Sequence, residues 1–133
     1  MIHEEICTYE VCKLAKEKGF PQHIGNDAYI VENEYDDEYE VGSCYPIQFI
    51  PDYLPTITAP THSLLQRWLR KKKNIHIEIV ATACGYFWIA DKINGTAITD
   101  SDILDRGPNE GGCWDEYEQA LEDAFRYVLE NLI

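Results

Sequence analysis

The residue of this sequence with the sharpest catalytic potential is Cys113, which stands in the run Gly111-Gly112-Cys113-Trp114 before a predicted helix. The dipole and the unpaired N–H groups at a helix N-terminus stabilise a thiolate. A small enzyme would use Cys113 as nucleophile and His76 or His62 as the base. Two acidic residues follow the run, however, and their negative charge opposes thiolate formation. The favoured interpretation is a small apolar residue that anchors the start of the helix.

Other residues with ligand chemistry are scattered along the chain. His3, Cys7 and Cys12 could bind a metal ion, but the sequence has no Cys-x2-Cys pair. Cys7 and Cys12 instead flank a predicted helix start at N′ and N4, where two soft apolar side chains form a hydrophobic staple. An aspartate-rich loop at 100–105 lacks the spacing of a calcium loop. The sequence therefore predicts neither a metal nor a cofactor.

A binding surface is predicted in the irregular region between residues 27 and 53, which holds five of the nine tyrosines with acidic residues among them. Tyr side chains provide contact area at small entropic cost, so Tyr-rich loops make good binding surfaces. The residues assigned to this surface are Tyr29, Tyr35, Asp36, Asp37, Tyr39, Tyr45 and Tyr53. The alternative is that these rings pack over the core where regular structure is lacking.

The charge of the chain restricts its partners. Eleven basic and 24 acidic residues among 133 give a net charge of −13. This charge repels nucleic acids and anionic membranes, and it permits a basic partner or the mimicry of DNA. A basic run, Arg70–Lys73, closes the second predicted helix, where it complements the helix dipole, so direct nucleic-acid binding is not expected. No signal peptide or membrane helix is recognisable, and we expect the five cysteines to be reduced thiols in the cytoplasm.

Capping residues and periodicity predict three helices. Thr8 is an N-cap and Gly19 a C′ residue for the first, while Asp115 and Glu118 form a capping box for the third. The apolar residues of each helix fall on one face, so each must pack against another element. The expected ranges are 8–19, about 60–73 and about 116–132.

Alternating isoleucines at 75, 77 and 79 begin a predicted three-stranded antiparallel meander over 75–99. Cys84-Gly85 and Asn94-Gly95 supply its turns. Short strands at 27–31 and 45–49 could extend this sheet, with Pro46 keeping the second at an edge. We therefore expect an α+β fold in which two or three helices pack on a small antiparallel sheet, as a single domain over 1–133.

Three blocks of the chain carry a family resemblance. They are Ala59-Pro-Thr-His-Ser-Leu-Leu-Gln-Arg-Trp-Leu-Arg70, Thr8-Tyr-Glu-Val-Cys-Lys-Leu-Ala-Lys-Glu-Lys-Gly-Phe20, and the ending with Tyr117-Glu-Gln-Ala-Leu-Glu122 and Val128-Leu-Glu-Asn-Leu-Ile133. Together they resemble a family of small phage and prophage (mobile-element) proteins of gut anaerobic bacteria. The resemblance implies a genomic setting and brings no catalytic residues with it.

These observations predict a phage-related accessory protein that is not an enzyme. It would bind a host or phage macromolecule, with a protein partner expected, through its acidic, Tyr-rich surface. A decoy that mimics DNA is a special case of this function. The alternative remains a small enzyme with a thiol nucleophile and a histidine base.

Overall fold

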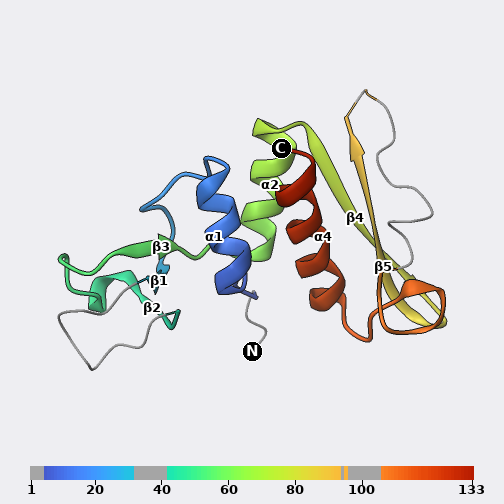
Figure 1. The fold of residues 1–133 in the computed structure, drawn as a ribbon, viewed down its shortest axis with the longest axis horizontal. Helices are drawn as coiled ribbons and strands as arrows, with labels where there is room; N and C mark the ends of the chain where they lie inside the picture. Colours follow the sequence, from blue (N-terminus) through green and yellow to red (C-terminus); the bar gives the residue numbers. More distant parts are fainter. Residues whose placement is uncertain (1–4, 32–41, 94, 96–105) are drawn as a thin grey trace. The chain divides into compact units, whose positions relative to one another are not determined.

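The computed structural model of the chain describes residues 5–31, 42–93, 95 and 106–133. It divides into two compact units, unit 1 (1–63) and unit 2 (64–133), whose elements are labelled in Figure 1. The described residues contain three α-helices and two small antiparallel sheets, which confirms the predicted α+β class. A single domain over 1–133 stays a prediction, and each unit is described by itself.

The first helix of unit 1, α1 (Tyr9–Glu17), begins and ends where the sequence predicts. The side chain of Thr8 accepts a hydrogen bond from a backbone N–H of the first turn. At the other end Gly19 has φ +97°, and the N–H of Phe20 donates to the Ala15 carbonyl at 2.9 Å. This is a Schellman ending, which satisfies carbonyl groups that the last turn leaves unpaired.

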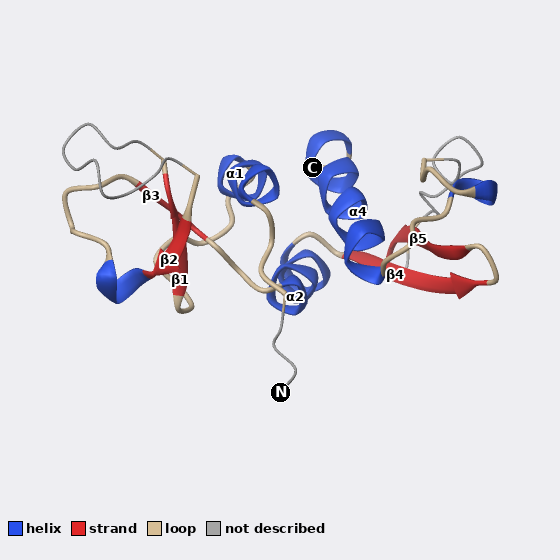
Figure 2. Cartoon of the chain, turned by 90° about the horizontal axis from the view of Figure 1, so that it is seen from below, coloured by secondary structure: helices blue, strands red, loops and turns tan. Residues whose placement is uncertain are grey.

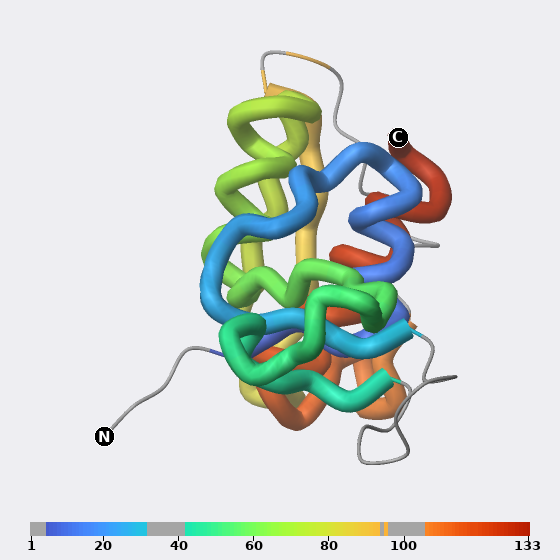
Figure 3. Tube along the Cα trace, turned by 90° about the vertical axis from the view of Figure 1, so that its left-hand side faces the viewer, coloured from blue at the N-terminus to red at the C-terminus, as the bar shows by residue number. Residues whose placement is uncertain are grey.

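Three short strands form the sheet of unit 1, in the order β2-β1-β3 with antiparallel pairing throughout. They can be followed side by side in Figure 3, and they are β1 (Asp27–Ile30), β2 (Cys44–Pro46) and β3 (Thr56–Thr58). The suggestion that strands from 27–49 extend the 75–92 sheet is wrong, because these strands pair with each other and with β3. β3 itself was not predicted.

The predicted strand at 45–49 is also wrong beyond its first two residues. β2 ends at Pro46, which lies on the edge of the sheet as expected, and the 3-10 turn η1 (Ile47–Phe49) follows. A proline donates no backbone hydrogen bond to a strand ladder. The Ile47 N–H instead donates to the Asn26 carbonyl at 2.9 Å, and the chain bends away from the sheet.

A buried cluster of unit 1 is formed by β1 and the connection from β2 to β3. Ala28, Ile30, Ile50 and Leu54 form one buried cluster, against which Tyr45 and Ile47 pack. The inward face of α1 is buried, and α1 lies beside β3. The predicted staple is present too, since Cys7 and Cys12 are both buried and the Cys12 thiol donates to the Cys7 carbonyl at 3.5 Å.

Helix α2 (His62–Lys72) leads into the hairpin of unit 2. It ends at Asn74, the predicted stop, whose φ of +60° is the left-handed conformation that asparagine tolerates. The hairpin consists of β4 (Ile75–Thr82) and β5 (Gly85–Lys92), paired antiparallel over their whole length. Its turn is at Cys84-Gly85, as predicted, with Gly85 at φ +123°. The proposed third strand, 96–99, lies outside the described residues.

Helix α4 (Tyr117–Asn131) packs on the hairpin, as Figure 2 shows. Its buried side chains are Ala120, Leu121, Ala124, Phe125, Val128 and Leu129. The predicted Asp115–Glu118 capping box is wrong by one residue, because Glu116 and Gln119 form it. Asp115 instead accepts a hydrogen bond from the Asn109 side chain at 2.7 Å. None of the helices in the described residues combines the length and apolar character that crossing a bilayer requires.

Candidate functional site

Cys113 lies at the turn end of the unit 2 hairpin, after the short 3-10 segment η2 (Glu110–Gly112). Its side chain is 3% exposed. The sulfur is 3.5 Å from the hydroxyl of Thr82, and the neighbouring Trp114 pairs with Tyr86 through two backbone hydrogen bonds of 2.8 Å. A thiol in this position fills the space beside the hairpin turn, whereas the sequence interpretation placed it at the start of the helix, and α4 begins only at Tyr117.

His76 stands at the opposite end of the same hairpin. His76 is exposed on β4, where it pairs in register with Asp91. It precedes Thr82 by six residues in the same strand. At a strand rise of about 3.3 Å per residue, this places it roughly 20 Å from the thiol. A base must come within hydrogen-bond reach of its nucleophile, so the hairpin gives no support to a Cys113–His76 pair. The other candidate base, His62, belongs to unit 1 and is described there with its own neighbours.

Within unit 1, His62 lies beside a different cysteine, Cys7. An isolated bridge between Ile6 and Thr61 joins the two segments. It is flanked by hydrogen bonds of 2.9 Å from Cys7 N–H to the Pro60 carbonyl and from His62 N–H to the Glu5 carbonyl. Diagonal neighbours of an antiparallel pair face the same side, so the thiol and the imidazole converge.

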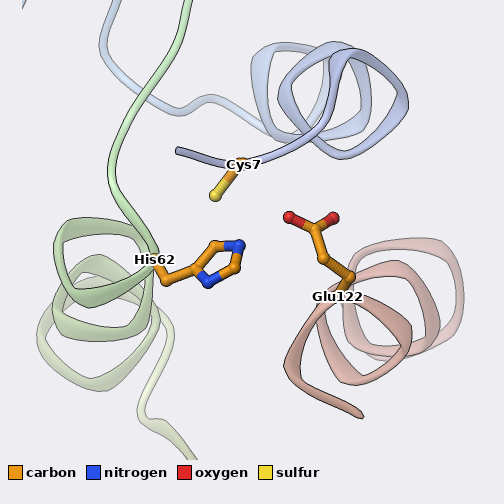
Figure 4. Close-up of side chains that lie close together, drawn as sticks. All are labelled: Cys7, His62 and Glu122. Carbon is orange, nitrogen blue, oxygen red and sulfur yellow. The ribbon is translucent and has the colours of Figure 1, made fainter. Parts of the chain in front are cut away.

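The two side chains point toward each other in Figure 4, with the sulfur and a ring nitrogen within 4.8 Å. Glu122, also drawn there, belongs to unit 2, which is described separately. Both Cys7 and His62 are buried, at 0% and 8% exposure. A buried thiol of this kind is closed to a macromolecular substrate and acts as a packed part of the core.

The thiol of Cys44 is held in its neutral form. Partial burial is the main cause, and together with the negative charge of Asp27 it raises the pKa of this thiol from 9.0 to about 11. Because the thiolate is the nucleophilic form of cysteine, Cys44 is unreactive at neutral pH.

The tyrosines assigned to the binding surface have separate places in the structure. Tyr29 is half-buried, donates its hydroxyl to the Cys7 carbonyl at 2.8 Å and meets the ring of Tyr9 edge-on at 5.6 Å. Tyr45 packs against the core cluster of unit 1, whereas Tyr53 is 56% exposed. Tyr29 and Tyr45 thus have packing roles, and Tyr53 lies on the surface. Tyr35, Asp36, Asp37 and Tyr39 lie outside the described residues.

Phe49 is a surface residue that the sequence did not single out. It ends η1 and is 62% exposed, the largest exposure among the large hydrophobic side chains of the described residues. It belongs, with Tyr53, to the segment of residues 47–56 that connects β2 to β3, which we call the 47–56 segment. In the predicted strand at 45–49, Phe49 would share one apolar face with Tyr45 and Ile47, and such a face is expected to be buried.

The 47–56 segment also borders a pocket of about 340 Å³. Its apolar lining comes from one stretch of chain: Ile47, Ile50, Pro51, Leu54 and Pro55. Its polar lining is Lys16, His23, Asp52 and Thr56. The pocket therefore combines an apolar floor with two basic side chains and one acidic side chain.

His23 is held at this pocket by an unusual backbone conformation. Its φ is +65°, which costs a residue with a Cβ on the order of 1 kcal/mol or more. Two contacts with Thr58 fix it, a 2.7 Å hydrogen bond from His23 N–H to the threonine hydroxyl and a 2.9 Å bond from Thr58 N–H to the Gln22 side chain. Lys16 reaches the same place from α1, with Nζ 3.5 Å from the Thr56 carbonyl.

In unit 2, Asp123, Trp88 and Arg106 form a polar cluster whose members bind one another. Asp123 on α4 accepts hydrogen bonds from the Trp88 indole at 2.9 Å and from two nitrogens of Arg106 at 2.6 and 2.9 Å. The hydrogen bond to Asp123 is the main cause that raises the pKa of Arg106. Arg106 also lies over the ring of Tyr127 at 5.2 Å. These hydrogen bonds connect Asp123 of α4 to Trp88 of the hairpin and to Arg106.

Comparison with known proteins yields no match, whether among protein-family models, curated proteins or solved structures. The resemblance to phage and prophage proteins therefore stays a prediction. The function must be inferred from the residues of this chain, among which the 47–56 segment and its pocket form a candidate contact surface.

Proposed function

We propose that this chain is a binding protein without catalytic activity, which contacts a host or phage macromolecule through the 47–56 segment. In this proposal it acts in the cytoplasm as an accessory protein of a phage or mobile element. The surface differs in part from the one expected from the sequence, since Tyr53 remains in it, Phe49 joins it, and Tyr29 and Tyr45 have packing roles.

The exposure of two large rings on one segment is the observation that carries the proposal. Phe49 and Tyr53 are 62% and 56% exposed and lie four positions apart in the sequence, with three pocket-lining residues between them. Other large aromatic side chains are buried, such as Trp88 at 1% and Phe125 at 0%, and Tyr117, at 41%, is less exposed than either ring. Exposed aromatic residues beside a pocket are typical of protein–protein contact sites, where such rings supply much of the binding energy.

The net charge supports a protein partner over a nucleic acid. At −13 the chain repels phosphate backbones at long range, while a partner that carries basic residues around an apolar centre is attracted. A decoy that occupies the DNA-binding surface of another protein is the special case in which this attraction dominates. Binding to a DNA-binding protein as a decoy should depend more strongly on salt than binding to a partner with an apolar centre, so the salt dependence of binding separates the two cases.

Affinity capture from a lysate of the native host, with the full chain immobilised, tests the proposal. The double variant Phe49→Ala/Tyr53→Ala should retain less than a tenth of the captured partner, since each hot-spot ring contributes about 1–2 kcal/mol. Tyr117→Ala is the matched control, because this ring is 41% exposed but lies in unit 2. Equal capture by the double variant and the parent would refute the proposal. Loss of capture in 0.5 M salt by all forms would favour the decoy.

A further inference from the structure

We infer that the pocket beside the 47–56 segment binds a carboxylate-bearing residue adjacent to an apolar side chain, presented by a short segment of the partner protein. This inference rests on the proposed function and names the chemistry that the same site recognises. It follows from three features of the pocket: its apolar floor, its two basic groups, and the position of its single acidic group.

The apolar floor determines that the ligand has a hydrophobic part. Ile47, Ile50 and Leu54 belong to the pocket lining, and Ile50 and Leu54 are also members of the buried cluster of unit 1. A volume of about 340 Å³ is at the lower end of the range for ligand pockets, roughly 300–1,000 Å³. It accommodates one large side chain with its neighbouring backbone. Phe49 and Tyr53, exposed on the same segment, extend the apolar contact beyond the pocket.

The basic groups determine the charge of the ligand. Lys16 and His23 line the pocket from α1 and from the turn that follows it. Lys16 is exposed, and among the described residues its contact is with the neutral carbonyl of Thr56, with no carboxylate paired to it. This is notable in a chain with 24 acidic and 11 basic residues. A carboxylate of the partner would complete a charge-assisted hydrogen bond at Lys16 Nζ.

The conformation of His23 adds a second, independent observation. The left-handed backbone there is strained, and hydrogen bonds to the β3 residue Thr58 maintain it. Strained residues that the surrounding structure holds in place cluster at binding sites. In this case the strain places an imidazole on the pocket wall, where a ring N–H can donate to the same carboxylate.

Asp52 sets the limit of this preference. It is the acidic residue of the pocket lining, so it repels a ligand that carries a second negative charge. Together with the net charge of −13, it disfavours a run of phosphates. The pocket therefore selects a single carboxylate with an apolar neighbour and discriminates against a nucleic-acid strand.

Titration of the full-length protein with three small probes, followed by amide NMR shifts, tests the inference. The probes are 4-phenylbutyrate, the neutral 4-phenylbutyramide and the cation 3-phenylpropylammonium. We expect 4-phenylbutyrate to shift the amides of Ile50, Thr56 and His23 with a dissociation constant on the order of a millimolar, as its size permits. 4-Phenylbutyramide should bind about threefold to tenfold more weakly than 4-phenylbutyrate, and 3-phenylpropylammonium should bind more weakly than both.

Substitutions then assign the charge preference to named groups. Lys16→Met should lower the affinity for 4-phenylbutyrate about threefold to tenfold and leave the affinity for 4-phenylbutyramide unchanged. Lys13→Met, on an exposed position of the same helix outside the pocket, is the control and should have no effect. His23→Asn keeps a residue that tolerates positive φ, removes the imidazole, and should weaken binding about twofold to fivefold. Asp52→Asn should raise the affinity for 4-phenylbutyrate about twofold to threefold.

The inference would be overturned if the three probes bound equally, or if the cation bound best. It would equally be overturned if a single-stranded oligonucleotide shifted the same amides more strongly than 4-phenylbutyrate, because a nucleic acid would then be the ligand. These results leave the proposed function open to its own test. Conversely, if 4-phenylbutyrate binds as expected while Phe49→Ala/Tyr53→Ala captures the partner normally, the pocket chemistry holds and the proposed surface fails.

Discussion

Trp88 of unit 2 and two rings of unit 1, Phe49 and Tyr53, lie in opposite surroundings. In unit 2, Trp88 is buried, its indole donates to Asp123, and its ring lies 5.5 Å from that of Tyr127. In unit 1, Phe49 and Tyr53 lie on the surface beside a pocket. The same residue class thus builds a core in one unit and a candidate contact surface in the other.

This difference follows from the regularity of the backbone. The unit 2 strands are eight residues long, and α4, at 15 residues, covers them with a continuous apolar face. The unit 1 strands have three or four residues, and the connection from β2 to β3 is a 3-10 turn with two prolines after it. Binding residues occur preferentially on irregular connections that a regular scaffold positions. The comparison therefore assigns stability to the unit 2 hairpin and agrees with the proposal that the 47–56 segment is a contact surface.

The largest expected effect comes from exchanging one ring in each unit for alanine. Trp88→Ala should lower the free energy of unfolding by about 3–5 kcal/mol, because it opens a cavity and leaves Asp123 without its indole donor. Phe49→Ala should change it by less than about 0.5 kcal/mol, since the ring is exposed. Urea unfolding followed by circular dichroism measures both. Similar losses for the two variants would remove the contrast between the units.

A smaller effect is expected from two glycines that share positive φ. A Cβ at Gly85, in the unit 2 turn, would overlap the backbone oxygen of Trp114, which is hydrogen-bonded to Tyr86 N–H. A Cβ at Gly19, in unit 1, would meet no atom within 4 Å. Gly85→Ala should therefore cost about 2–4 kcal/mol, and Gly19→Ala about 1 kcal/mol from backbone strain alone. Equal costs in urea unfolding would show that strain, and not packing at the turn, dominates both sites.

The smallest effect concerns Cys44 in unit 1 and Cys84 in unit 2. With a pKa of about 11, the Cys44 thiol is neutral in the folded protein between pH 9 and 11, where an unfolded chain ionises it. Its contribution to stability is thus complete below pH 9 and disappears as the pH rises to 11. Cys44→Ala should therefore lose less stability over this window than the parent.

Alkylation checks the same assignment directly. Iodoacetamide at pH 8, followed by mass spectrometry, should modify the exposed Cys84 first and Cys44 much more slowly. Rapid modification of Cys44 would contradict the raised pKa and the partial burial that causes it.

Local sequence signals predicted most of the elements. Thr8 and Gly19 bounded α1, Asn74 ended α2, and alternating isoleucines gave β4, because each of these signals acts within a few residues of backbone. The capping box was misplaced because the neighbouring pairs Asp115–Glu118 and Glu116–Gln119 have similar chemistry. Only the hydrogen bond from Asn109 to Asp115, a contact outside the helix, separates them. β3 was missed because three residues among prolines carry too little periodicity to be recognised.

By itself, the sequence determined the α+β class, the helix ends, the hairpin and its turn, since these depend on propensities and short-range periodicity. Only the tertiary structure decided which residues come together from distant segments. It placed Cys113 beside Thr82 and away from His76, brought His62 to Cys7, and gathered Lys16, His23 and the 47–56 segment around one pocket. Such juxtapositions depend on strand order and on which loops fold over the core, and no local pattern in the chain encodes them.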